Sequence, residues 1–87
     1  MKALSPGQLV RAKAGRDKGR QFFIVGIIDE KHVYIADGDK RRIEAPKKKK
    51  LMHLQVSGFV SDVVKERLEN GEKVENALLR RQLALHQ

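Results

Sequence analysis

The sequence predicts a mainly β fold, a small SH3-like barrel of four to five antiparallel strands followed by a C-terminal helical hairpin. Short apolar runs alternate with turns rich in Gly, Asp and Lys over residues 1–56, a pattern typical of small all-β domains. After residue 56 the apolar spacing lengthens to that of helices. We therefore expect a barrel over residues 1–56 and a helical tail over residues 57–87 that packs on the barrel.

The first two expected strands cover residues 8–14 and 21–28, and a turn bounded by Gly15 and Gly19 joins them. Glycine adopts positive φ at little cost, so these two positions let a short connection reverse direction. The residues on both faces of the second strand are apolar, which predicts a central strand with one face in the barrel and the other face covered. Gly26 in its middle predicts a bulge.

Basic side chains surround this hairpin. They are Arg11, Lys13, Arg16, Lys18 and Arg20. Arg11 and Lys13 belong to the outward-facing set of the first strand. Backbone amides beside the glycines add donors for an oxyanion, so we interpret the tip as a phosphate-contacting loop, with an ordinary solvated turn as the alternative. Asp17 is expected to order the loop through local hydrogen bonds.

A third strand is expected over residues 32–37. The Asp37-Gly38-Asp39 sequence predicts a hairpin turn into a short fourth strand through Arg41 and Ala45. Pro46 interrupts this pattern, and a lysine run then leads into a last strand over residues 51–56. Tyr34, on the third strand, is the best candidate for stacking on a base, and a barrel-lining tyrosine is the alternative.

The densest positive stretch follows the third strand and consists of Lys40, Arg41, Arg42, Lys47, Lys48, Lys49 and Lys50. A mixture of lysine point charges and planar guanidinium groups suits phosphate binding with some contact to base edges, so we assign these residues to RNA contact. Two alternatives remain. Lysines also protect exposed strand edges from aggregation, and a lysine string can imitate a nuclear localisation signal.

The tail is expected to form two short helices. Ser57 or Ser61 would cap the first, and Asn70-Gly71 would end it. The second is expected over residues 75–85, with Val74 packing on its first turns as a hydrophobic staple. Helices this short are marginal alone, so we expect them to dock on the outer face of the second strand. Pairing with a partner protein or a second copy is the alternative.

The net charge of +8 lies entirely in the first part of the chain. Residues 1–54 hold 14 Lys or Arg against 6 Asp or Glu, whereas residues 55–87 hold 5 of each. A requirement for solubility would not segregate charge in this way, so the distribution favours a polyanion-binding face. Chance within a small lysine-rich protein is the alternative.

Several functional classes find no support in the composition. The chain has no cysteine, which removes disulfides, thiol nucleophiles and sulfur-ligated zinc. The three histidines are scattered and no serine has an identifiable base partner, so we expect no metal, no cofactor and no enzymatic activity. No segment approaches the roughly 20 apolar residues that cross a bilayer. We expect a soluble, cytoplasmic chain without a membrane partner.

One part of the sequence resembles a known family. Gly7, Val10 and the Gly-Arg-Asp-Lys-Gly turn, followed by a hydrophobic strand, resemble the KOW motif of NusG-type antitermination factors and several large-subunit ribosomal proteins. Residues 33–38, 40–42 and 49–55 extend the resemblance to the fourteen-e, six-e and twenty-seven-e ribosomal protein group and its short bacterial relatives. The resemblance implies an SH3-like barrel.

The same resemblance implies a non-enzymatic RNA-binding protein of the translation apparatus. Its partners would be ribosomal RNA, reached through the basic loops, and neighbouring ribosomal proteins, and the free chain would be a monomer. The alternative is a protein-interaction adaptor that docks on a transcription or ribosome-assembly complex. This chain lacks the long basic extensions of the ribosomal proteins, which leaves open a permanent subunit, an accessory factor or a conditional regulator.

Overall fold

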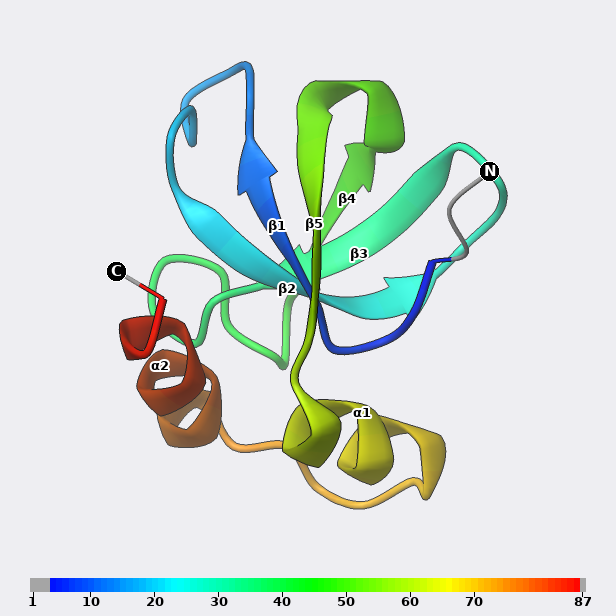
Figure 1. Cartoon of the computed structure of the whole chain (residues 1–87), viewed down its shortest axis with the longest axis vertical. Coiled ribbons are helices and arrows are strands. Elements are labelled where there is room, and N and C mark those ends of the chain that lie inside the picture. Colours follow the sequence, from blue (N-terminus) through cyan, green and yellow to red (C-terminus); the bar gives the residue numbers. More distant parts are fainter. Residues whose placement is uncertain (1–3, 87) are drawn as a thin grey trace.

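Five antiparallel strands form one sheet in the order β4-β3-β2-β1-β5 (Figure 1). The structure is a computed structural model and describes residues 4–86. The strands are β1 (Gln8–Ala12), β2 (Gln21–Ile27), β3 (His32–Ala36), β4 (Lys47–Lys50) and β5 (Leu54–Val60). This arrangement confirms the mainly β prediction, including its strand number.

The central strand β2 is buried on both faces, as its two apolar sets predicted. The side chains of Phe22, Phe23 and Ile24 are fully inaccessible to solvent. Neighbouring residues on a strand point to opposite faces, so the rings of Phe22 and Phe23 enter two different cores. The register of β2 against β3 shifts between Ile24 and Gly26, which confirms the predicted bulge. A Cβ at Gly26 would lie 3.2 Å from the ring of Tyr34.

One core lies on the face of the sheet turned away from the helices, and its buried members are Val10, Ala12, Phe22, Ile24, Val33, Ile35 and Leu54. The other core lies between the sheet and the helices, and its buried members are Leu9, Phe23, Ala36, Val64, Val74, Leu78, Leu79 and Leu83. Phe23 therefore packs under the helices rather than facing solvent. Burying apolar side chains of this size contributes roughly 1.5–3 kcal/mol each, which fixes the helices on the sheet.

Two helices follow β5, and Figure 1 shows both at one end of the sheet. Helix α1 (Asp62–Glu69) begins after Ser61, whose hydroxyl accepts a hydrogen bond from the N–H of Val64 at 3.5 Å. This selects Ser61 rather than Ser57 as the cap. Gly71 has a φ of 69° just after the helix and supplies the predicted stop. Helix α2 (Asn76–Ala84) follows, and Val74 before it joins the same core as Leu79.

The predicted strand through Arg41 and Ala45 is wrong. Residues 37–46 form an irregular connection between β3 and β4. Side-chain oxygens take up its backbone donors, because the N–H of Arg41 donates to Asp37 Oδ1 and the N–H of Ile43 donates to Asn76 Oδ1, each at 2.8 Å. A backbone whose donors are satisfied in this way has no need of a strand partner.

The last predicted strand is also corrected. The lysine run forms β4 and pairs with β3, a single turn of 3₁₀ helix η1 (Leu51–His53) follows, and β5 pairs with β1 at the other edge of the sheet. The expected strand over residues 51–56 therefore begins three residues later and continues to Val60. β5 runs across residues 56 and 57, so the sheet extends past the expected start of the helical tail to Val60.

Candidate nucleic-acid interface

The β1–β2 turn is an ordered loop. Gly15 and Gly19 have φ angles of 84° and 87°, the left-handed region that glycine adopts without strain. The N–H of Lys18 donates to the carbonyl of Gly15 at 3.2 Å, and the N–H of Gly19 donates to that of Ala12 at 2.8 Å. The side chains of Arg16 and Lys18 remain exposed at the tip. The turn therefore presents two cations on a defined backbone.

Asp17 at the centre of this turn is buried and gathers three cations. Arg41 Nη2 lies 3.0 Å and Lys47 Nζ 3.4 Å from Asp17 Oδ2. Lys40 Nζ lies 3.2 Å from the other oxygen, Oδ1, as an ion pair without hydrogen-bond alignment. We call these four residues the Asp17 cluster. It joins the β1–β2 turn to the connection before β4 and to β4 itself.

The expectation that Asp17 would order its loop through local hydrogen bonds is wrong, because its side-chain partners lie 23 to 30 positions later in the chain. Burial opposes the ionisation of Asp17, but the neighbouring Arg41 and Lys40 cations outweigh that effect and lower its pKa to about 2. Three cations against one carboxylate leave an excess of two positive charges. The Asp17 cluster is therefore a positive surface organised by a buried anion.

A second basic surface lies on the outer face of β3 and β4. Tyr34 is directly opposite Lys48, and His32 is directly opposite Lys50. Residues opposite each other in a sheet share a face, and Lys48, Lys50 and Tyr34 are all exposed, Tyr34 to 41%. Lys48 thus lies across from an accessible aromatic ring and Lys50 lies diagonal to it, an arrangement that can hold a base and its phosphates.

Lys49 differs from the other lysines of the run. Its side chain points to the opposite face of β4, where the residue is only 9% exposed. Its Nζ donates a hydrogen bond to the carbonyl of Ala14 at 3.3 Å. Lys49 thus supports the base of the β1–β2 turn, and it takes no part in the exposed surface.

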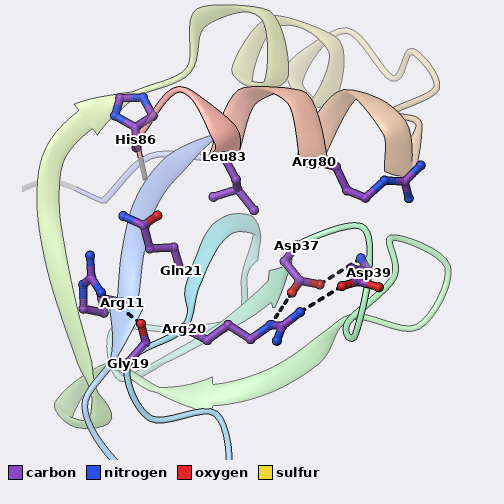
Figure 2. A pocket seen from close by; sticks show the side chains of 9 residues that line it. All are labelled: Arg11, Gly19, Arg20, Gln21, Asp37, Asp39, Arg80, Leu83 and His86. Carbon is purple, nitrogen blue, oxygen red and sulfur yellow. Dashed lines mark hydrogen bonds and ion pairs between the residues drawn. The ribbon is translucent and has the colours of Figure 1, made fainter.

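Arg11 and Arg20 line an open pocket of about 600 Å³ beside α2 (Figure 2). Arg20 donates to Asp37 Oδ2 at 2.8 Å and to Asp39 Oδ2 at 3.0 Å. Arg11 donates to the carbonyl of Gly19 at 2.9 Å. Arg20 is therefore neutralised within the protein, whereas the charge of Arg11 faces a neutral partner.

Ten of the thirteen predicted RNA-contacting residues thus fall into four groups. Arg16 and Lys18 form the tip, Lys40, Arg41 and Lys47 surround Asp17, Tyr34, Lys48 and Lys50 share one sheet face, and Arg11 and Arg20 line the pocket. Lys13 and Arg42 are exposed outside these groups, and Arg42 pairs with Glu44 at 3.4 Å. Lys49 is buried.

Sequence reasoning missed two contributors from the tail, one on α2 and one just after it. Arg80 and His86 line the same pocket as Arg11, although the tail carries no net charge. The signal was available in the helical spacing. Arg80 lies three residues before Leu83, a member of the buried stripe, so the two share one side of the helix.

Two other site types find no support within residues 4–86. No group of three or more His, Asp or Glu side chains comes together there as metal ligands would. In the same residues, neither helix has the length and apolar character that crossing a bilayer requires.

A known relative adds to this geometry. No protein-family model matches the sequence. A Bacillus subtilis (strain 168) protein named "Putative ribosome-binding protein YbzG" is 33% identical over 70 residues, which cover 80% of this chain and 95% of that protein. The chain belongs to the YbzG family. The likeness spans most of both proteins, so it extends well beyond the glycine-bounded turn.

Proposed function

We propose that this member of the YbzG family is a non-enzymatic RNA-binding protein that associates with the ribosome and contacts ribosomal RNA through basic loops. The observation that carries the proposal is the Asp17 cluster, in which a buried carboxylate gathers three cations beside the exposed Arg16 and Lys18. The name of the relative supports the ribosome as the partner. A cytoplasmic location and a monomeric free state belong to the same proposal.

The physical basis is electrostatic. Phosphate contacts supply most of the affinity in complexes of this kind, and they position the protein without reading sequence. The exposed cations of the tip, the Asp17 cluster and the β3–β4 face provide such contacts. Proteins read unpaired bases largely by stacking them on aromatic side chains, and the β3–β4 face exposes Tyr34 among lysines. Recognition would therefore depend mainly on RNA shape.

The proposal also includes the finer fold assignment, an SH3-like barrel of the KOW type. Its support is the curved antiparallel sheet together with positive φ angles at Gly7, Gly15 and Gly19. These glycines belong to the motif that the sequence resembles. Within this proposal the turn between the first two strands contacts the RNA, and the exposure of Arg16 and Lys18 there supports it.

Co-sedimentation with purified ribosomal subunits over a range of salt concentrations tests the proposal. If about five phosphates are neutralised, the logarithm of the affinity falls with the logarithm of the salt concentration with a slope of roughly −3.5 to −4.5. A slope near zero, or migration with RNA polymerase instead of ribosomal subunits in a lysate gradient, would reject it and favour the adaptor alternative.

A further inference from the structure

The open pocket beside α2 lies outside the Asp17 cluster. Its lining combines arginines, carboxylates and a pair of apolar and aromatic side chains. It is about 600 Å³ in volume, within the range of pockets that hold small molecules. Figure 2 shows Arg11 and Arg80 on different rims, with Arg20 and its two carboxylates between them. The lining residues are Arg11, Gly19, Arg20, Gln21, Asp37, Asp39, Arg80, Leu83 and His86.

Arg11 and Arg80 retain most of their N–H donors and their positive charge for a ligand. Arg11 donates to the carbonyl of Gly19 at 2.9 Å, and Arg80 donates to the carbonyl of Gly38 at 2.6 Å. A guanidinium group has five N–H donors, so these bonds orient each side chain and leave further donors for a ligand. Both partners are neutral, so the two positive charges stay available to phosphate oxygens.

The carboxylates argue against a site for phosphate alone. Asp37 is largely occupied, because its Oδ1 accepts hydrogen bonds from the N–H groups of Asp39 and Arg41 while its Oδ2 accepts one from Arg20. Asp39 uses Oδ2 for Arg20, and its side chain is 71% exposed, which leaves Oδ1 able to accept from a ligand. A ligand that suits both rims and Asp39 carries anionic groups and also a hydrogen-bond donor.

The α2 side of the pocket is apolar and aromatic. Leu83 belongs to the buried stripe of α2. The ring of His86 lies 4.0 Å from that of Phe59, centroid to centroid, and is tilted by 47° to it, so contact with Phe59 holds His86 in position. Flat rings and arginine planes are the surfaces on which proteins stack unpaired RNA bases.

From these features we infer that the pocket takes one unpaired nucleotide of the RNA. Its flanking phosphates contact Arg11 on one rim and Arg80 on the other, and its base lies against Leu83 and His86. An exocyclic amino group of the base donates to Asp39, so adenine, cytosine or guanine is preferred over uracil. This inference rests on the proposed function and adds α2 to the RNA-contacting surface.

The test uses the full chain and three labelled RNA hairpins with the same stem. One has a single bulged adenine, one a single bulged uracil, and one is fully paired. Fluorescence anisotropy should show that the wild type binds the adenine bulge roughly tenfold more tightly than the paired hairpin, with the uracil bulge between them.

The matched variants are Arg80→Ala and Arg81→Ala, which remove the same charge from adjacent positions of α2. Only Arg80 lines the pocket, and Arg81 is exposed. We expect Arg80→Ala to abolish the preference for the bulge and Arg81→Ala to keep it. His86→Ala should reduce the preference too, and it provides a second variant if Arg80→Ala lowers the melting temperature.

Equal affinity of the wild type for the three hairpins, or equal effects of Arg80→Ala and Arg81→Ala, would overturn the pocket assignment. Salt-dependent binding to the paired hairpin would still be present in that case, so the proposed function would stand. Failure of the wild type to bind any of the hairpins or a ribosomal subunit would reject both proposals.

Discussion

The guanidinium of Arg41 lies 3.0 Å from the carboxylate of Asp17, and this ion pair fixes the β1–β2 turn to the connection between β3 and β4. The two residues are separated by 24 positions in the chain. Lys47 pairs with the same carboxylate oxygen as Arg41, and Lys40 pairs with the other oxygen. The shape of the basic surface therefore depends on an acidic residue that would not itself contact RNA.

Replacing Asp17 with Asn should destabilise the fold by about 2 kcal/mol at neutral pH. Removing one partner of a buried ion pair costs roughly 3–5 kcal/mol, and the cost is smaller here because the three cations reach solvent. Urea unfolding measures the difference. Asp39→Asn is the control, since that carboxylate is exposed and pairs only with Arg20. An equal loss in both variants would show that the Asp17 cluster has no special role.

The pKa of Asp17 predicts a specific pH dependence. Its value falls from 3.8 to about 2 on folding. A lowered pKa stabilises the fold fully above the unfolded value, and this contribution, about 2 kcal/mol, is lost as the pH falls from about 4 towards 2. Asp37 acts in the same direction. Burial raises its pKa, but the hydrogen bonds from Arg20 and from the N–H groups of Arg41 and Asp39 together outweigh burial and lower it.

Unfolding free energies measured across that pH range should therefore fall more steeply for the wild type than for Asp17→Asn. The variant keeps the contribution of Asp37 and loses only that of Asp17. Parallel pH profiles for the two proteins would contradict the lowered pKa.

The sequence predicted those features that depend on neighbouring residues. Gly15 and Gly19 marked the turn because the backbone there needs positive φ, and the two apolar sets of β2 marked the central strand. The conformation of residues 37–50 depends instead on partners far away in the chain. The pattern around Arg41 suggested a strand, but Asp37 and Asn76 take up its backbone donors. The lysine run has no alternation of apolar and polar residues that would predict a strand. It forms one because it pairs with β3.

In the candidate site, too, the sequence predicted the features set by neighbouring residues and missed those set by distant contacts. Arg16 and Lys18 were predictable because their exposure follows from the turn. The long-range pairing of Asp17 and the burial of Lys49 could not be inferred, because both depend on how β4 lies against the turn. Arg80 reaches the pocket only because α2 packs over Phe23.

Reversing both charges at the tip, with Arg16→Glu and Lys18→Glu together, should weaken RNA binding without destabilising the fold. Both side chains are exposed, so surface changes there should alter stability by no more than about 0.5 kcal/mol each. The salt slope of binding to ribosomal RNA should decrease by about 2, one for each lost phosphate contact. A melting temperature lowered as far as in a core variant such as Phe23→Ala would contradict the assignment.

Tyr34→Ala should reduce affinity for single-stranded RNA, whereas Tyr34→Phe should retain it. Stacking of a base on an aromatic ring contributes roughly 1–3 kcal/mol, and it requires the ring rather than the hydroxyl. Titrations of both variants with the same RNA give the comparison. If Tyr34→Ala binds like the wild type, the β3–β4 face contacts RNA only through Lys48 and Lys50.

Gly38→Ala should be far more destabilising than Gly19→Ala, although both glycines have positive φ. A Cβ at Gly19 meets no atom within 4 Å, so the cost there is limited to backbone strain of about 1 kcal/mol. A Cβ at Gly38 would collide with the carbonyl of Asn76 at the start of α2. The backbone of α2 would have to move, so we expect a loss of at least about 3 kcal/mol. Urea unfolding of the two variants gives these values, and limited proteolysis should show α2 released only in Gly38→Ala. Equal stabilities would mean that α2 does not pack against residues 37–46, and the pocket that contains Arg80 would then lose one of its walls.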